Sequence, residues 1–167
     1  IAGLMKHMRS MTAIINPIVN SYKRLVPGYE APTYIAWSAT NRSPLIRVPA
    51  ARGLGTRVEL RSPDCATNPY LAIAVCLAAG IKNNLQPVDS IQRDIYSMTD
   101  EERDEAGIEN LPKNLYEAIQ EMRKSDFVKG VLGKEVFKKY IKAKEEEWME
   151  YTSQVTDWEI DRYLGRI

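Results

Sequence analysis

A pentapeptide of alternating charged and apolar residues, Arg-Val-Glu-Leu-Arg, carries the side chains best suited to chemistry. Strict alternation is typical of a half-buried β-strand, so we expect Val58 and Leu60 to face a core. Arg57, Glu59 and Arg61 would then share the opposite face, with neighbours about 7 Å apart. Such a row could hold a phosphate, a divalent metal ion and an anionic substrate side by side. The same alternation also fits a solvated sheet face with weak ion pairs.

Two segments upstream of this pentapeptide add further arginines and one isolated acid. Residues 41–49 alternate around Arg47 and also carry Arg42, so two adjacent strands would direct guanidinium groups toward one place. Guanidinium groups match the oxygens of carboxylates and phosphates, which predicts a polyanionic ligand. Residues 20–32 contain prolines and a glycine that favour a loop, with Glu30 near its tip. A loop that presents one acid in this way is typical of an active-site flap.

The segments that must position these residues predict an α+β fold, with antiparallel strands in the N-terminal half followed by a helical C-terminal half. Asn16 and Pro17 would stop a first helix, and Thr67 or Asn68 would cap a second, largely buried one. The expected strands cover residues 34–39, 45–48 and 57–60. Helices are expected over residues 3–15, 70–85, 99–107, 115–123 and 127–132, and from residues 134 and 156 onward. Thr99 with Glu102 and Thr156 with Glu159 would form capping boxes at two of these starts. One stripe of the helix from residue 134 is expected to face the core: Phe137, Tyr140, Ile141, Lys144 and Trp148.

Length and composition fit one globular domain, because 167 residues with 44% hydrophobic content can build one core. The formal net charge of +1 gives no general attraction to nucleic acid or to anionic membranes. Cys65 and Cys76 lack the spacing of a zinc or redox site, and Cys76 fits a core thiol. The longest apolar run, residues 70–80, is too short to cross a bilayer. These features predict a cytoplasmic protein.

Three stretches of the sequence together resemble the catalytic domain of bacterial type I glutamine synthetases. They are residues 20–32, 41–49 and 57–71, the last of which is RVELRSPDCATNPYL, and they follow the order of the family's motifs. A weaker likeness continues from residue 94 to the end, so the resemblance spans essentially the whole chain. It implies that residues 1–167 form the C-terminal portion of that catalytic domain. The N-terminal β-grasp domain and the first half of the catalytic domain, with further acidic metal ligands, are then expected to be absent.

The resemblance implies a nucleotide and metal site built on the arginine segments. Glu59 would be a ligand of one divalent ion, Mg²⁺ or Mn²⁺, which prefer hard oxygen donors. Arg42 and Arg47 would bind the phosphates of ATP, and Arg57 would line the same site. Some members of the family have a lysine before the last motif, where this chain has Arg52. Arg52 either takes that role or is an ordinary exposed loop arginine.

The same resemblance implies a site for L-glutamate next to the nucleotide. Arg24 and Arg61 would bind its carboxylates and leave the γ-carboxylate directed at ATP. Arg42 would steady the transferring phosphoryl group. Glu30 would close over the acyl phosphate and help to deprotonate the attacking ammonium. Glu30 and Arg42 are therefore the expected catalytic residues, and both would also contact glutamate.

The implied activity is ATP-dependent ligation of ammonia to L-glutamate through γ-glutamyl phosphate, which yields L-glutamine, ADP and phosphate. Two alternatives stay open: a γ-glutamyl-polyamine ligase of the same fold, and a non-catalytic module for assembly or regulator binding. The presence of the whole charged set favours an enzyme origin, since a module that only binds partners has no need of it. The chain alone is expected to be inactive, because the remaining metal ligands would be missing.

The C-terminal segment is expected to contact other proteins. Trp158, Tyr163 and Leu164 follow a capping-box signal, and exposed aromatic residues at a terminus often form a partner surface. The resemblance implies a dodecamer of two stacked hexameric rings, with this segment joining the rings or binding a regulatory protein. Regulation by feedback, by a partner protein or by adenylylation at Tyr96 stays open.

Overall fold

The computed structural model describes residues 1–29, 31–40, 43–81, 85–86 and 89–166 of the chain. In chain order, its elements are α1 (Ala2–Ile15), α2 (Ser21–Arg24), β1 (Trp37–Ser38), β2 (Ile46–Arg47), η1 (Gly53–Gly55), β3 (Glu59–Leu60), α3 (Pro69–Ile81), η2 (Ile95–Ser97), α4 (Asp100–Glu105), α5 (Leu115–Arg123), α6 (Asp126–Leu132), α7 (Lys134–Thr152), α8 (Asp157–Tyr163) and η3 (Leu164–Arg166).

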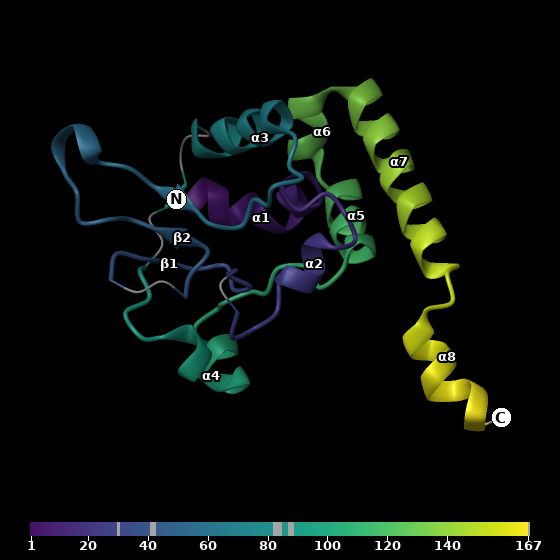
Figure 1. Ribbon diagram of the computed structural model, residues 1–167. Helices are drawn as coiled ribbons and strands as arrows, with labels where there is room; N and C mark the ends of the chain where they lie inside the picture. Colours follow the sequence, from purple (N-terminus) through teal and green to yellow (C-terminus); the bar gives the residue numbers. More distant parts are fainter. Residues whose placement is uncertain (30, 41–42, 82–84, 87–88, 167) are drawn as a thin grey trace.

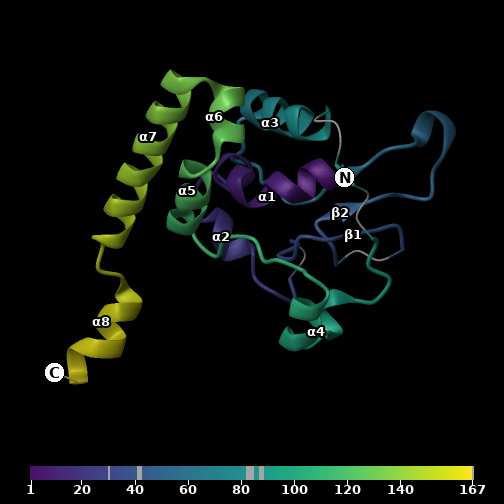
Figure 2. The ribbon, with the colours of Figure 1, turned by 180° about the vertical axis from the view of Figure 1, so that it is seen from behind.

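Helix α1 lies at the centre of the molecule, and the other long helices are arranged around it (Figures 1 and 2). Helices α3 and α5 pack directly against α1, and α7 packs against α5 and α6. Met8, Met11 and Ile15 of α1 are fully buried in the main core, at the spacing that places side chains on one helical face. The sheet and the loops that carry the charged residues lie beside this helical layer.

The C-terminal end of α1 is fixed to the segment that follows β3. The helix ends where expected: the Asn16 amide donates the last helical hydrogen bond to the Thr12 carbonyl at 2.8 Å, and Pro17 disfavours continuation. The last carbonyl groups of a helix have no partner within the helix and must find one elsewhere. The Ile15 carbonyl accepts hydrogen bonds from the Asp64 amide at 3.1 Å and from the Thr67 hydroxyl at 2.6 Å.

Strands β1, β2 and β3 form one small sheet in that order. The antiparallel β2–β3 pair matches Ile46 with Leu60 and Arg47 with Glu59, as the alternation of apolar and charged residues predicts. Ile46 is buried and Leu60 packs against the core, so the charged pair lies on the other face. Together with the helices that follow, this sheet confirms the α+β class.

The strands differ from the expectation in length and in one pairing. Each has two residues, so Val58 lies before β3 and is exposed rather than in the core. The β1–β2 pair is parallel, not antiparallel. A parallel pair requires the chain to return to the edge from which it started. Because a two-residue strand advances only about 7 Å, a short connection is enough for that return.

Helix α3 begins as predicted but is less buried than expected. Asn68 is the cap, since its side-chain oxygen accepts hydrogen bonds from the Tyr70 and Leu71 amides, and Pro69 occupies the first helical position. One face packs on the core and includes the partly buried Cys76, whose thiol pKa is raised by burial. The opposite face exposes its large apolar side chains: Tyr70, Ile73, Leu77 and Ile81. Within the described residues, no helix is both long and apolar enough to span a membrane.

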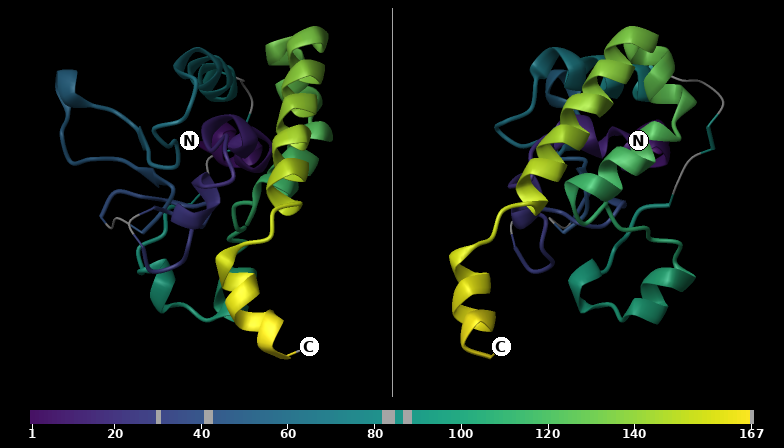
Figure 3. Two further views of the ribbon diagram at one scale, coloured as in Figure 1. Left: turned by 45° about the vertical axis from the view of Figure 1, so that its right-hand side comes forward. Right: turned by 90° about the vertical axis from the view of Figure 1, so that its right-hand side faces the viewer.

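The C-terminal half is helical, as predicted. The two predicted capping boxes are present at the starts of α4 and α8, where Thr99 pairs with Glu102 and Thr156 with Glu159. The predicted apolar stripe of α7 faces the core, and its Tyr140 hydroxyl donates to the Ala13 carbonyl at 2.8 Å. Helix α8 extends beyond the rest of the molecule after the end of α7 (Figure 3).

We predict that Gly3→Ala lowers the free energy of unfolding by about 1–3 kcal/mol, the usual cost of overpacking. A Cβ at Gly3 in α1 would overlap the Ala79 carbonyl of α3, so the two helices would have to separate. Gly130→Ala in α6 is the matched control, because nothing lies near the added methyl group. It should leave stability unchanged or raise it by up to about 1 kcal/mol. Equal effects of the two substitutions in urea denaturation would contradict the close helix contact.

Candidate functional site

Three of the predicted site residues form one cluster on the polar face of the sheet. Arg47 of β2 and Glu59 of β3 are direct cross-strand partners, so their side chains project from the same face. Arg47 Nη1 donates to Glu59 Oε2 at 3.1 Å. Arg57 contacts the other carboxylate oxygen, with Nη2 at 2.7 Å and Nε at 2.9 Å from Glu59 Oε1. We call these three residues the sheet cluster.

The sheet cluster keeps its carboxylate ionised. The hydrogen bond from Arg57 is the largest cause that lowers the pKa of Glu59, and Arg47 adds to it. Exposed ion pairs of this kind contribute little to stability, so the cluster is not needed to hold the sheet together. It does fix two positive charges at the edges of one negative charge. This pattern suits a ligand that carries phosphates together with a divalent cation.

Among the described residues of the site, Glu59 is the one proposed as a metal ligand. Its carboxylate is an ionised hard oxygen donor, which fits Mg²⁺ or Mn²⁺ as one ligand. Within the part of the chain that the structure describes, no group of three or more acidic, histidine or cysteine side chains could enclose a metal ion. Further ligands would therefore have to come from outside the described residues.

Arg24 lies at the end of α2 and contacts two buried polar residues. Its Nη2 donates to the Asn16 side-chain oxygen at 3.1 Å and also to the Ser62 carbonyl. Asn16 in turn donates from Nδ2 to the Ser62 hydroxyl at 2.9 Å. Asn16 and Ser62 are fully buried. Among the described residues, Arg24 Nε has no hydrogen-bond partner although it is buried, so the protein leaves part of this guanidinium unsatisfied.

Arg61 stands next to the same buried group. Its amide continues the sheet ladder with a hydrogen bond to the Leu45 carbonyl at 3.0 Å, and its Nη1 lies 3.3 Å from the Pro44 carbonyl. Because Ser62 is the next residue, the contact with Asn16 fixes the backbone immediately after Arg61. Arg24 and Arg61 are thus joined through Ser62. The sequence indicates Asn16 only as a helix stop and carries no local signal for Ser62.

Other predicted positions fall outside this arrangement. Glu30 and Arg42 lie outside the described residues. Arg52 lies in the loop around η1 that projects from the body in Figure 1, and its Nη1 donates to the Pro49 carbonyl at 2.7 Å and the Ala51 carbonyl at 2.9 Å. These contacts are local to the loop, which fits the interpretation of Arg52 as a loop arginine.

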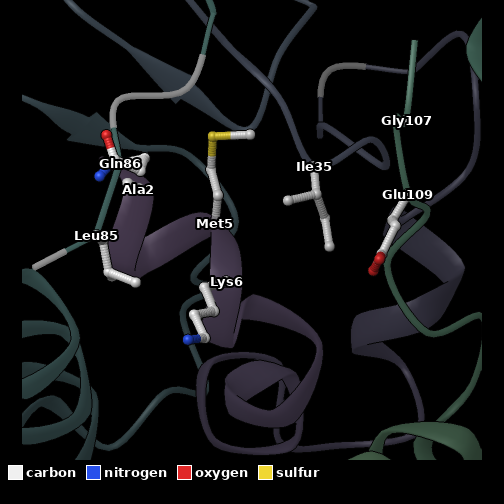
Figure 4. A pocket seen from close by; sticks show the side chains of 8 residues that line it. All are labelled: Ala2, Met5, Lys6, Ile35, Leu85, Gln86, Gly107 and Glu109. Carbon is white, nitrogen blue, oxygen red and sulfur yellow. The ribbon is translucent and has the colours of Figure 1, made fainter.

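A separate pocket of about 380 Å³ lies at the N-terminal end of α1. Figure 4 shows side chains of α1 on one side and Ile35 and Glu109 on the other. None of the predicted site residues that the structure describes lines this pocket. Its lining is mostly apolar, with Lys6 and Glu109 as the charged residues. The pocket therefore offers no set of groups for phosphoryl or acyl chemistry.

Comparison with known proteins gives a consistent result over the whole chain. A family model described as "Glutamine synthetase, catalytic domain" matches residues 1–163. A protein named glutamine synthetase from Clostridium saccharobutylicum is 56% identical over 99% of this chain. One of the same name from Methanosarcina mazei is 58% identical over 100% of the chain. The chain spans 38% of the length of each of these two relatives.

A solved structure agrees with the sequence comparison. The structure titled "GmaS/ADP complex-Conformation 1" superposes with a TM-score of 0.83 at 37% identity. The match covers 98% of this chain and 38% of that one. The small sheet and the helices around it are therefore an arrangement that this solved structure also contains.

We predict that Glu59 titrates below the ordinary range of glutamate and that Arg57→Gln raises its pKa more than Arg47→Gln does. The reason is that the hydrogen bond from Arg57 is the larger of the two influences. Carbon-detected NMR titration of the side-chain carboxyl measures this directly. The contribution of these ion pairs should be present at neutral pH and lost as the pH falls through the lowered pKa. An unshifted Glu59 in the unmodified chain would contradict the cluster geometry.

Proposed function

This chain belongs to the glutamine synthetase catalytic-domain family, and we propose that it forms the C-terminal portion of a catalytic domain that joins ammonia to L-glutamate with consumption of ATP. The observation that carries the proposal is the sheet cluster, together with the hydrogen bonds that join Arg24 to Asn16 and to Ser62, the residue after Arg61. The identity of 56% and 58% to relatives named glutamine synthetase favours ammonia over an amine as the nucleophile.

The chemistry explains why the site needs these residue types. Hydroxide or oxide is a poor leaving group, so the γ-carboxylate must first accept the terminal phosphoryl group of ATP, with release of ADP. Ammonia then attacks the acyl carbon of γ-glutamyl phosphate, and the carbon–oxygen bond to phosphate breaks. One proton must leave the nitrogen as the amide forms. Negative charge accumulates in the first step, whereas the second step requires a base.

Arg47 and Arg57 are the proposed phosphate ligands. Both are permanently charged and project near one carboxylate, so they can meet phosphate oxygens without a change of protonation. Glu59 is the proposed metal ligand of this chain. A bound divalent cation would supply positive charge that neutralises the phosphates during transfer. Arg42 is proposed to act on the transferring group, and Glu30 to accept the proton that ammonium must lose before the resulting ammonia attacks.

Arg24 and Arg61 are the proposed partners of the glutamate carboxylates. Arg61 directly precedes Ser62, and the side chain of Arg24 donates to the Ser62 carbonyl, so both arginines are tied to a residue that Asn16 fixes. A substrate held by two guanidinium groups loses rotational freedom before the reaction begins. Such orientation can account for several kcal/mol of the barrier reduction.

We further propose that this portion works only when joined to the rest of such a domain. Glu59 offers one metal ligand, whereas octahedral Mg²⁺ requires several. The exposed apolar face of α3 also supports this proposal, since a contiguous row of large apolar side chains is rarely left in water. Its residues are Tyr70, Ile73, Leu77 and Ile81.

The proposal predicts that the chain is active when it replaces the matching segment of the Clostridium saccharobutylicum relative. This chimera should form glutamine from glutamate, ammonia and ATP with Mg²⁺, within about tenfold of the unmodified host, because single side-chain contacts at the junction carry energies of this order. The 167-residue chain alone should form none. Replacement of ammonia by putrescine should yield little product.

Two arginine variants control this experiment. In the chimera, Arg61→Ala should raise KM for glutamate by about tenfold or more, as expected for loss of a charge-assisted contact. Arg93→Ala removes an arginine that pairs with Glu102 on the surface, and it should change neither KM for glutamate nor KM for ATP. A folded, assembled chimera without activity, or an active isolated chain, would refute the proposal.

The C-terminal segment is proposed to join subunits of a double-ring assembly. Helix α8 extends from the body and exposes Trp158, Tyr163 and Leu164, of which Trp158 is 63% exposed. Trp158 and Tyr163 contact each other edge to face with ring centroids 5.9 Å apart. An isolated helix of this length is marginal in water, so its own capping box and a partner surface would be needed to keep it ordered.

Deletion of the residues after Thr152 from the chimera should therefore give smaller particles, because the apolar contacts between rings would be lost. Light scattering measures the particle mass, and KM for glutamate should change less than the mass does. Trp158→Ala should weaken the same apolar contacts between rings and lower the particle mass by less than the deletion does. An intact double ring after the deletion would instead assign this segment to regulator binding.

A further inference from the structure

The buried contacts of Arg24 differ from those of the sheet cluster in one respect that bears on substrate binding. The sheet cluster pairs cations with an anion, whereas Arg24 is held by neutral oxygens, those of the Asn16 amide and the Ser62 carbonyl. A guanidinium held by neutral acceptors keeps its full positive charge. It is therefore fixed in position and still available to an anion.

The Asn16 amide can make these contacts in one orientation only. Arginine donates and cannot accept, so the amide oxygen must face Arg24 and the amide nitrogen must face the Ser62 hydroxyl. The contact between Asn16 and the Ser62 hydroxyl is buried and links positions 46 residues apart in the sequence, whereas the contact with Arg24 is partly buried. The backbone of Asn16 is itself fixed by its helical hydrogen bond and by the following proline. The amide is thus held at both ends and cannot turn without loss of a buried hydrogen bond.

The consequence for Arg24 follows from its donor groups. Two acceptors occupy the two hydrogens of Nη2, which leaves Nη1 as the terminal nitrogen for a substrate carboxylate. Ser62 also directly follows Arg61, so the same amide fixes the backbone beside the second arginine. We infer that Asn16 is a positioning residue for glutamate binding, which it supports by holding Arg24 through its side chain and Arg61 through Ser62. This inference rests on the proposed function, specifically on Arg24 as a glutamate ligand.

Asn16→Asp is the most informative change. The carboxylate keeps the shape and can accept hydrogen bonds from both Arg24 and the Ser62 hydroxyl, so the fold is retained. It also places a negative charge against Nη2 of Arg24, which neutralises the guanidinium that would attract the substrate carboxylate. In the chimera, KM for glutamate should rise by about tenfold, the effect expected from losing one charge-assisted hydrogen bond, while KM for ATP stays within about twofold.

Two further variants separate positioning from stability. Ser62→Ala removes the acceptor that fixes the amide but keeps the Ser62 carbonyl, so it should raise KM for glutamate by a smaller factor than Asn16→Asp. Thr67→Val is the matched control. It removes the hydrogen bond from the Thr67 hydroxyl to the Ile15 carbonyl at the end of α1, which lies at the same junction but does not involve Arg24. It should lower the melting temperature while leaving KM for glutamate unchanged.

Arg24→Gln distinguishes failure of this inference from failure of the proposed function. If Arg24→Gln and Asn16→Asp both raise KM for glutamate and Thr67→Val does not, the inference is supported. If Arg24→Gln raises KM for glutamate but Asn16→Asp and Ser62→Ala leave it unchanged, as Thr67→Val does, the positioning role is refuted and the proposed function stands. If Arg24→Gln leaves KM for glutamate unchanged, Arg24 is not a glutamate ligand, and the inference fails together with that assignment.

Discussion

The junction between the end of α1 and the segment after β3 is the constraint on which the rest of the site depends. At this junction the carbonyl groups of a helix end, a buried amide and a buried hydroxyl all find partners. Without those partners each buried group would cost about 1–3 kcal/mol. The helix is in turn held by the core, through Met8, Met11 and Ile15. Packing of the core therefore fixes the position of Arg24 and of the strand that carries Glu59 and Arg61.

The two groups of arginines are held by different physics. Arg47 and Arg57 meet an exposed carboxylate, and such pairs are screened by solvent and exchange partners easily. Arg24 donates hydrogen bonds to neutral oxygens of two buried residues, and it would lose both hydrogen bonds if it moved away. A site that must bind and release a nucleotide with its metal can use the first arrangement. A site that must hold one small substrate in a fixed orientation is better served by the second.

Local patterns were sufficient to predict much of this architecture. The alternation in residues 41–49 and 57–61 predicted that charged side chains of two adjacent strands meet in one place, and the register of β2 with β3 agrees, since it keeps both apolar partners on the core side. Asn16 and Pro17 predicted the end of α1, and the threonine and glutamate pairs predicted the starts of α4 and α8. In each case the signal lies within a few residues of the feature.

What could not be predicted depends on contacts between distant residues. Nothing near Asn16 indicates that its amide meets Ser62, since that contact requires the sheet and α1 to be placed first. The parallel pairing of β1 with β2 depends on the direction in which the chain enters β2, which the residues of the two strands do not specify. The apolar composition of α3 predicted burial, but the face with Ile73 and Leu77 has no partner among the described residues to cover it.

Two sets of arginines, one on the sheet and one at the junction, are proposed to bind the nucleotide and glutamate respectively. Cryo-electron microscopy of the chimera with ADP, Mg²⁺ and glutamate would locate both ligands. We expect nucleotide phosphate density beside Arg47 and Arg57, with the metal at Glu59, and glutamate carboxylate density beside Arg24 and Arg61 while Asn16 keeps its contact with Ser62. Ligand density away from these side chains, or an Arg24 that has left Asn16 to reach its ligand, would contradict this proposal.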